Sequence, residues 1–196
     1  MKILLIGDKE STYLWDHFDY ARFSDIDCII STGDLKAEYL RFLVTVTNVP
    51  LFFVHGNHDD HYETNRPEGC DSIDGKLIEF KGKRILGIGG SMLYNGGSHQ
   101  FSEFQMKTRI LKLTPRIMLN HGFDILVSHS PARGLGDGTD LCHTGFQGLR
   151  DLVEKYHPAY HLHGHQHLSY NNDPRIIRHG STTIINCYEY HLLTID

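Results

Sequence analysis

Short apolar runs that stop abruptly at Asp, Asn or His are the feature that most constrains how this chain folds. Continuous apolar runs of this kind are typical of strands buried on both faces of a sheet. Glycine often stands directly before the polar group, where it lets the chain turn sharply. We therefore expect strands at residues 3–6, 28–30, 51–54, 125–127 and 160–162, each followed by a polar turn.

The polar groups that follow these five strands are of the types that bind metals or transfer protons. In open α/β sheets, ligands bind beyond the carboxyl ends of the strands, so we expect the five groups to converge on one site. A single Gly-polar turn means little alone, whereas the whole series favours a metal cluster. The groups are Asp8-Lys9-Glu10, Asp34, Asn57-His58-Asp59, His129 and His165-Gln166-His167.

Helical spacing of apolar residues occurs between the strands. We expect Asp34 to cap the first helix in addition to any metal binding. Pro115 is expected to break or kink the second helix, and Thr144 to cap the third. The helices are expected at 37–47, 104–119 and 146–156.

The remaining segments predict antiparallel strands and one loop. Residues 76–80 and 84–89 flank a turn at Gly82 and predict a hairpin, and the Gly-rich stretch 89–97 predicts a long loop. We expect a single α/β domain, residues 1–196, with helices covering mixed sheets. Its C-terminus is expected to be an antiparallel meander of strands at 176–179, 182–186 and 189–195.

Composition limits the partners and the cellular compartment to expect for this chain. The net charge is −5 with histidine neutral and no Lys/Arg cluster is present, which argues against a long nucleic-acid duplex as partner. No apolar stretch is long enough for a membrane span, and the run after Met1 is too short for a signal peptide. The four cysteines show no framework spacing, which favours free thiols. A cytoplasmic protein without a membrane partner is the expectation.

The five polar groups resemble the pattern of the calcineurin-like metallophosphoesterases, which runs D-x-H, G-D, G-N-H-[DE], H and G-H-x-H. The resemblance extends from residue 3 to about residue 190. Its most specific parts are Gly56-Asn57-His58-Asp59 and Gly164-His165-Gln166-His167. It implies a four-layer α/β/β/α sandwich of two mixed β-sheets flanked by helices, with two divalent metal ions between the sheets.

The resemblance also implies a role for each polar residue. A hydroxide bridging the two metal ions would attack phosphorus in line. His58 would protonate the leaving alcohol, and Asp59 would orient the His58 ring. The implied ligands are Asp8 and His167 for the first ion, Asn57, His129 and His165 for the second, and Asp34 as the bridge between them.

Glu10 stands where the family pattern has its first histidine. A glutamate can ligate a hard cation, and we expect it to favour Mn²⁺ or Fe, with Zn²⁺, Ni²⁺ or Mg²⁺ as alternatives. Glu10 is then the third ligand of the first metal. The competing interpretation is that Glu10 points towards Lys9 or solvent and leaves the first metal weakly held.

Residues near these groups have competing interpretations. His161 and His163 are expected to be structural rather than metal-binding. His143 precedes a predicted helix and either faces an anionic substrate or belongs to an ordinary loop. Tyr94 and Asn95 either line the mouth of the site or lie on a surface loop.

Two functions follow from this sequence. The first is a phosphoesterase that hydrolyses a phosphodiester, with a nucleotide-like one as an option, or a small phosphomonoester, and that small substrate is its partner. The second is a catalytically degenerate protein of the same fold that binds a protein partner. Because only one ligand type departs from the pattern, the enzyme is favoured. The oligomeric state is left open.

Overall fold

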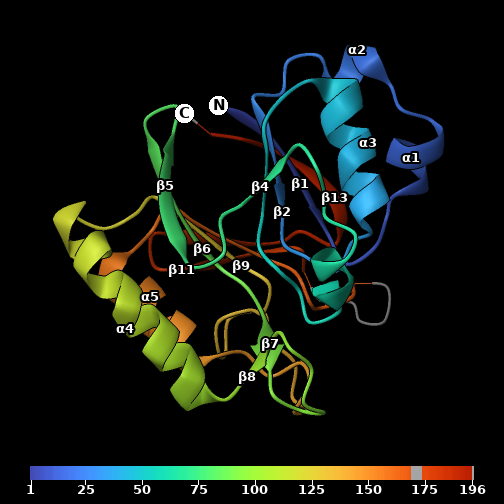
Figure 1. The fold of residues 1–196 in the computed structure, drawn as a ribbon. Coiled ribbons are helices and arrows are strands. Elements are labelled where there is room, and N and C mark those ends of the chain that lie inside the picture. The colour runs from blue at the N-terminus through green and yellow to red at the C-terminus, as the bar shows by residue number, and fades with distance from the viewer. Residues whose placement is uncertain (169–173, 196) are drawn as a thin grey trace.

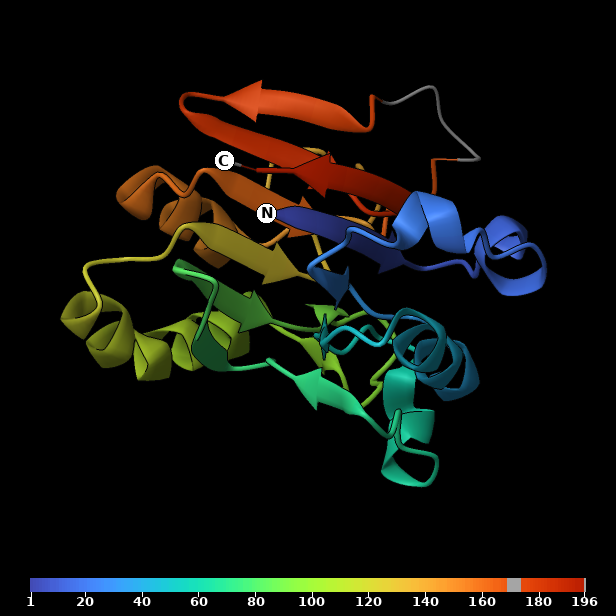
Figure 2. The same cartoon turned by 90° about the horizontal axis from the view of Figure 1, so that it is seen from above.

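A computed structural model describes residues 1–168 and 174–195 of the chain. Two mixed β-sheets pack face to face, and helices cover the outer face of each (Figure 1). Viewed from above, the helices lie on opposite sides of the molecule with the two sheets between them (Figure 2). The predicted four-layer α/β/β/α sandwich is therefore confirmed.

The first sheet is built on the N-terminal strand and has the order β13-β1-β2-β3-β4. Strands β1 to β4 run parallel to one another, and β13 pairs antiparallel with β1. The carboxyl ends of β1, β2 and β3 therefore meet at one edge of the sheet. The strands are β1 (Lys2–Gly7), β2 (Cys28–Ser31), β3 (Leu51–Phe53), β4 (Cys70–Ser72) and β13 (Glu189–Thr194).

The second sheet has the order β11-β12-β10-β9-β6-β5. Its central strands β12, β10, β9 and β6 run parallel, and the edge strands β5 and β11 pair antiparallel with their neighbours. The strands are β5 (Lys76–Phe80), β6 (Lys83–Ile88), β9 (Ile125–Ser128), β10 (Tyr160–His163), β11 (Ile176–His179) and β12 (Thr182–Asn186). A short parallel pair, β7 (Ser91–Met92) with β8 (Gln100–Phe101), extends from the end of β6.

Three helices cover the first sheet and two cover the second (Figures 1 and 2). Helix α4 begins where Ser102 and Gln105 form a reciprocal capping box. Helix α3 ends at Asn48, which adopts the left-handed conformation common at helix C-termini. The helices are α1 (Thr12–Asp16), α2 (Tyr20–Phe23), α3 (Ala37–Thr47), α4 (Glu103–Leu119) and α5 (Gln147–Tyr156), with a 3₁₀ turn, η1, at Asp59–Glu63.

Apolar side chains fill all three spaces between the four layers. On β1, Ile3 and Leu5 face the second sheet, whereas Leu4 and Ile6 face the helices of the first. Because successive strand residues point to opposite faces, a strand buried on both sides is apolar throughout. This explains the continuous runs in the sequence. The free cysteines Cys28 and Cys187 belong to the core between the sheets.

The predicted C-terminal meander is wrong in its last strand. β11 and β12 pair antiparallel as expected, but β13 crosses to the other sheet and pairs with β1, with Lys2 opposite Thr194. Glu189 begins β13 with a φ of 60°, at the point where the chain changes sheets. The apolar pattern of β13 suits either sheet, so its choice of partner was not encoded locally.

Three local predictions about helices also differ from the structure. α4 continues through Pro115, so the break offered as one alternative is absent. Proline deprives the Leu111 carbonyl of its helical donor, but Leu111 is exposed and water can reach that carbonyl. Thr144 donates its hydroxyl to the Asp140 carbonyl and does not cap α5. Asp34 does not cap α3, because its Oδ1 accepts the His58 N–H instead.

Within the described ranges, no helix combines the length and the apolar character that crossing a lipid bilayer requires.

Candidate metal centre

Five strand ends, three from the first sheet and two from the second, bring the predicted polar residues together. Asp8 follows β1 directly and His129 follows β9 directly, while Asp34, Asn57 and His165 lie in the turns after β2, β3 and β10. Asp8, Asp34 and His165 have φ values of 63°, 57° and 68°. Non-glycine residues adopt this left-handed region at a cost, and such strain concentrates at functional sites.

Two glycines make the close approach of these turns feasible. A Cβ on Gly56 would lie 2.0 Å from Asp34 Oδ1, and a Cβ on Gly164 would lie 2.6 Å from Asp8 Oδ2. Any side chain at either position would therefore displace a carboxylate of the centre. The glycines noted in the sequence thus serve the packing of one turn against another.

Four acceptor atoms converge at the centre. His129 Nε2 lies 2.9 Å from Asn57 Oδ1, 3.1 Å from His165 Nδ1 and 3.5 Å from Asp34 Oδ2. The side chain of His129 is fully buried, and those of Asn57 and His165 are nearly so. Asp34, His129 and His165 each offer one ligand atom within 4.8 Å of the others.

The hydrogens of these groups are directed away from the centre. His129 Nδ1 lies 2.8 Å from the Thr32 carbonyl, and His165 Nε2 lies 2.7 Å from the Cys142 carbonyl. A carbonyl can only accept, so both of these nitrogens carry hydrogen, and in the neutral rings the opposite nitrogens present lone pairs. The Asn57 amide donates to the Tyr94 hydroxyl at 3.2 Å, which turns Asn57 Oδ1 inward.

Lone pairs packed this closely require a positive charge among them. Burial opposes charging of His129, but the carboxylates of Asp34 and Asp8 outweigh it and raise the pKa of His129 above its usual value. Burial and the neighbouring His129 lower the pKa of His165, which disfavours a positive charge on both imidazoles at once. Two imidazole nitrogens, an amide oxygen and a carboxylate oxygen form a donor set that fits a divalent transition metal.

Asp8 supplies an unsatisfied carboxylate oxygen beside this set. Its Oδ1 accepts the His165 backbone N–H at 2.6 Å, while its Oδ2 is buried without a hydrogen-bond partner among the described residues. Burial raises the pKa of Asp8 to about 7, and the nearby Asp34 adds to the shift. A buried carboxylate oxygen without a donor is an acceptor suited to a second cation.

The other two predicted ligands of the first metal lie farther out. His167 is half-buried against the Tyr188 ring, with 5.1 Å between ring centroids. Glu10 accepts from the backbone N–H of Lys36 at 3.3 Å and lies 3.4 Å from its ammonium group. The structure therefore brings together the residues predicted for the second metal but pairs Glu10 with Lys36.

The two predicted catalytic residues have different surroundings. His58 is exposed, and its backbone N–H donates to Asp34 Oδ1 at 2.8 Å. Asp59 is fully buried, and its Oδ2 accepts from the N–H groups of Gly56 and Asp34 at 2.7 and 3.0 Å. Asp59 thus fixes the backbone of both turns, and no described contact joins it to the His58 ring that it was expected to orient.

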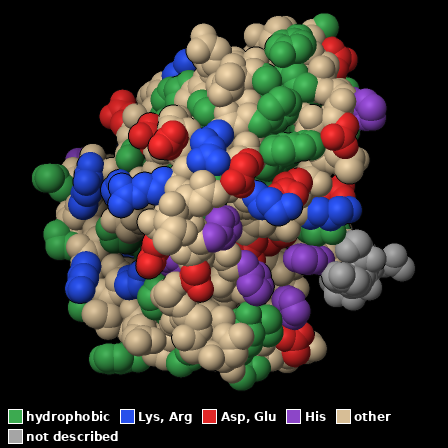
Figure 3. Space-filling model, turned by 45° about the vertical axis from the view of Figure 1, so that its right-hand side comes forward, with side chains coloured by type: hydrophobic (Ala, Val, Ile, Leu, Met, Phe, Trp, Pro, Cys, Tyr) green, Lys and Arg blue, Asp and Glu red, His purple; other side chains and the backbone are tan. Residues whose placement is uncertain are grey.

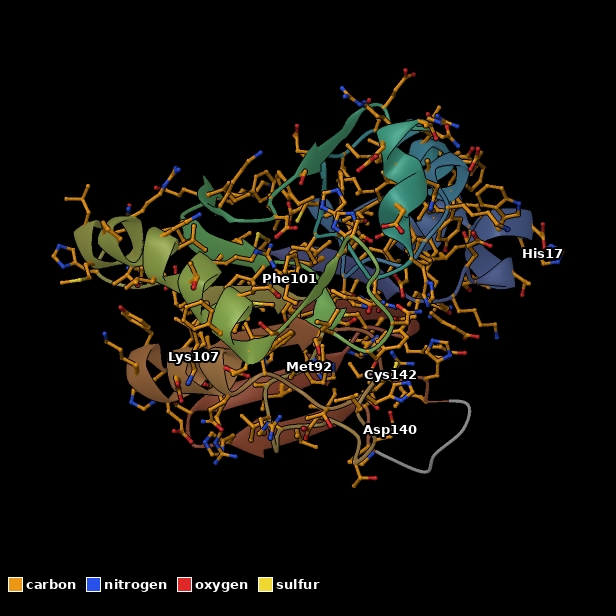
Figure 4. The ribbon with its side chains drawn as sticks, turned by 60° about the horizontal axis from the view of Figure 1, so that its bottom comes forward. His17, Met92, Phe101, Lys107, Asp140 and Cys142 are labelled. Atoms are coloured by element: carbon orange, nitrogen blue, oxygen red, sulfur yellow. The ribbon has the colours of Figure 1, made fainter. Side chains whose placement is uncertain are left out.

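Residues outside the motifs complete the centre. The carbonyls of Thr32 and Cys142 set the two imidazole orientations, and no sequence signal pointed to them. Cys142 and Asp140 lie on the loop between β9 and α5 (Figure 4). On the same loop, His143 Nδ1 lies 2.8 Å from Asp140 Oδ2, and its ring packs 5.2 Å from that of His165.

His161 and His163 are buried within β10, as structural residues would be.

The centre opens to the surface through a hollow of about 340 Å³. Several histidine side chains gather on one face of the molecule, beside acidic and basic ones (Figure 3). The hollow is lined by Asp8, Lys9, Glu10, Asp34, Leu35, Lys36, His58 and His61. In this hollow the carboxylates and histidines could hold metal cations, and the lysines and those cations would attract a small anionic ligand.

Comparison with known proteins agrees with this geometry. The model of the calcineurin-like phosphoesterase family matches residues 1–169, and the chain belongs to this family. The family match supports a hydrolase that acts on phosphate esters with divalent metal ions.

Individual relatives are distant. UPF0046 protein K07C11.7 of Caenorhabditis elegans is 24% identical over 213 residues, which cover 95% of this chain and 69% of that protein. TT1561 of Thermus thermophilus superposes with a TM-score of 0.65 at 13% identity, over 96% of this chain and 89% of its own. A 5'-nucleotidase from Candida albicans gives 0.54 at 13% identity, over 94% of this chain and 45% of its own. At these identities the structural likeness establishes the fold.

Proposed function

We propose that this chain is a dinuclear metal-dependent phosphoesterase that hydrolyses a phosphodiester. The observation that carries the proposal is the set of four converging acceptor atoms at His129, Asn57, His165 and Asp34, whose hydrogens are committed elsewhere. When bound, two divalent ions would activate water and neutralise charge on the phosphoryl oxygens.

The ligands divide into two groups around Asp34. Asn57, His129 and His165 would hold the ion of the buried set. Asp8, through its unsatisfied Oδ2, and His167 would hold the other, and Asp34 would serve both. We also assign Glu10 to the ion held by Asp8 and His167, which requires the Glu10 carboxylate to leave Lys36.

The residues of the hollow would position the substrate. Lys36 is exposed at its rim and supplies a positive charge for a non-bridging phosphoryl oxygen. The His58 ring stands on the same rim, where it would donate a proton to the departing alcohol. The bond from Asp34 Oδ1 to the His58 N–H fixes the backbone of His58 relative to the metal ligands. A diester suits this open hollow because both substituents of the phosphate have room.

A degenerate scaffold is the second candidate, and the Glu10–Lys36 contact favours it. Glu10 is the one side chain that departs from the family pattern, and in this contact its partner is a lysine and not a metal. A scaffold of this kind would retain the fold without turnover.

Turnover of bis(p-nitrophenyl) phosphate by the chain with added Mn²⁺ tests the proposal. We expect activity that depends on Mn²⁺ and falls by about 10²- to 10⁴-fold in His58→Ala, the range typical of a lost general acid. His17→Ala, which removes an exposed histidine far from the centre (Figure 4), is the control and should be as active as the wild type. Absence of turnover with any of Mn²⁺, Fe²⁺, Zn²⁺, Ni²⁺ or Mg²⁺ would favour the scaffold.

A further inference from the structure

The loop between β9 and α5 carries three side chains that a metal ion could bind. Asp140, Cys142 and His143 each offer one ligand atom, and these three atoms lie within 4.8 Å of one another (Figure 4). Two such groups of ligands occur among the described residues, and this one shares no residue with the group at Asp34, His129 and His165. The loop is therefore a separate candidate for cation binding.

One turn of the chain brings the three ligand atoms together. Asp140 Oδ1 accepts the backbone N–H of His143 at 3.0 Å, and the Asp140 carbonyl accepts the Thr144 N–H at 2.9 Å. The His143 ring lies beside the same carboxylate, with 2.8 Å between Nδ1 and Asp140 Oδ2. Cys142 lies within this turn. Atoms bound to one tetrahedral zinc ion are about 3–4 Å apart, so small side-chain movements would complete such a site.

The turn is fixed to the segment that carries His165. The Cys142 carbonyl lies 2.7 Å from His165 Nε2, and the His143 carbonyl accepts from Gln166 Nε2 at 2.7 Å. The His143 carbonyl also accepts the Gly138 N–H at 2.9 Å. Groups that are already held in place lose less conformational entropy when they bind a ligand. The backbone of the turn is thus preorganised for binding.

The sulfur of Cys142 determines which metal ion suits the loop. Thiolate is a soft ligand that favours Zn²⁺, whereas Mn²⁺ and Mg²⁺ favour oxygen ligands. One sulfur, one nitrogen and one oxygen leave the fourth tetrahedral position of a zinc ion to water. The residues proposed for the dinuclear centre offer nitrogen and oxygen atoms and no sulfur. The loop and the centre would therefore select different metals.

The contact between Asp140 and His143 does not prevent metal binding. Their side chains are 62% and 41% exposed. An exposed pair of this kind contributes little to stability, so a metal ion can replace the hydrogen bond at small cost. The Cys142 thiol is half-buried beside this pair.

We propose that Asp140, Cys142 and His143 form a binding site for one Zn²⁺ ion, with water as the fourth ligand. The Cys142 thiol would release its proton to solvent as the sulfur binds zinc. One oxygen of Asp140 and one nitrogen of His143 would be the other two protein ligands. The site shares no residue with the dinuclear centre, so it does not depend on the proposed function.

The absorption of Co²⁺, which substitutes for Zn²⁺ and reports sulfur ligands, tests this site in the full chain kept reduced. We expect a thiolate-to-cobalt charge-transfer band in the near ultraviolet that disappears when Zn²⁺ is added. Loss of an outer contact alone typically costs about 10- to 100-fold in metal affinity, so loss of a ligand should cost at least as much. His143→Ala and Asp140→Asn should therefore each raise the Kd for Co²⁺ by about tenfold or more.

Two matched variants separate the loop from the rest of the chain. Cys142→Ser should lose the band, whereas Cys70→Ser, which changes another half-buried free cysteine, on β4, should keep it. Asp34→Asn should also keep the band, because no thiolate belongs to the dinuclear centre. Failure of the dinuclear centre is thereby distinguished from failure of the loop site. Circular dichroism of each variant confirms that it is folded.

Three results would overturn the proposal. Absence of the band in the wild type would show that no thiolate binds the metal. A band that persists in Cys142→Ser would assign the metal to another cysteine. Unchanged Co²⁺ affinity in both His143→Ala and Asp140→Asn would reduce the site to a single thiol.

Discussion

The Nε2 atom of His129 lies 2.9 Å from Oδ1 of Asn57, although neither atom has a hydrogen to offer in the neutral state. The hydrogen of the imidazole is on Nδ1, directed at Thr32, and the amide hydrogens are directed at Tyr94. Two acceptors at this distance repel unless a positive charge stands between them. A proton on His129 Nε2 supplies this charge when no metal is bound, in line with the raised pKa of His129, and a metal ion bound by the same two atoms would replace that proton.

Tyr94 should strengthen metal binding without touching the metal. Its hydroxyl accepts a hydrogen bond from the Asn57 amide and thereby keeps Asn57 Oδ1 turned towards the centre. Loss of such a supporting contact typically weakens metal affinity about 10- to 100-fold. We expect Tyr94→Phe to raise the Kd for Mn²⁺ by about tenfold, measured by calorimetry on the metal-free protein. Tyr20→Phe, at an exposed tyrosine on α2, is the control. Equal Mn²⁺ affinity in Tyr94→Phe and the wild type would refute this role.

The loop that carries Tyr94 is held by one buried side chain. Gln100 Oε1 accepts from the backbone N–H groups of Tyr94, Asn95 and Gly96 at 3.1–3.2 Å. The sequence offered a choice between the mouth of the site and a surface loop for Tyr94 and Asn95. Because Tyr94 contacts the metal ligand Asn57, Tyr94 belongs to the site. Asn95 donates its backbone N–H to Gln100.

Lys36 should compete with the metal for Glu10. If Glu10 is a ligand, removing the Lys36 ammonium leaves only the backbone N–H of residue 36 to hold it, and the exposed ion pair that is lost contributes about 0–1 kcal/mol. We expect Lys36→Met to bind Mn²⁺ a few-fold more tightly than the wild type. Lys9→Met removes a charge of the same sign from the same hollow and controls for general electrostatics. Equal effects of the two substitutions would show that Glu10 does not bind the metal.

Asp74 should stabilise the fold above acidic pH. It accepts from Arg109 Nη2 at 2.6 Å and from the Gly89 N–H at 2.7 Å, and it lies 3.3 Å from His55 Nδ1. Burial would raise the pKa of Asp74, but His55 and Arg109 outweigh it and hold the pKa below the ordinary 3.8. A lowered carboxyl pKa stabilises the folded state above the unfolded pKa, and this stability is lost as pH falls through the folded pKa.

Urea unfolding of Asp74→Asn tests this interaction. We expect a loss of about 3 kcal/mol at pH 7, because Arg109 is left partly buried without its carboxylate. The difference from the wild type should shrink as the pH falls below about 4. Asp71→Asn, at an exposed residue of the neighbouring strand, should change stability little at either pH. A constant difference across this pH range would contradict the account.

The strand ends of the centre were predictable because their signal is local. A strand buried on both faces is apolar throughout, and its end is marked by glycine and a polar residue, as at Gly33-Asp34 and Gly164-His165. Both the α/β class and the convergence of Asp34, Asn57, His129 and His165 follow from that pattern. The family pattern added the four-layer arrangement, the assignment of the ligands and the number of metals expected.

Features that depend on distant partners were not predictable. α5 begins at Gln147 because Glu103, from α4, receives its first N–H groups, so no capping residue stands next to it in sequence. β13 pairs with β1 across nearly the whole length of the chain. The carbonyl of Cys142 orients His165, yet every residue has a carbonyl and none is marked in the sequence.

The most direct test of the two-metal centre is calorimetric titration of the metal-free chain with Mn²⁺. The account predicts two ions per chain in the wild type and in His17→Ala. It predicts weakened binding of both ions in Asp34→Asn, because Asp34 is the ligand proposed to serve both. A single ion in the wild type, or two ions with unchanged affinity in Asp34→Asn, would contradict the dinuclear centre.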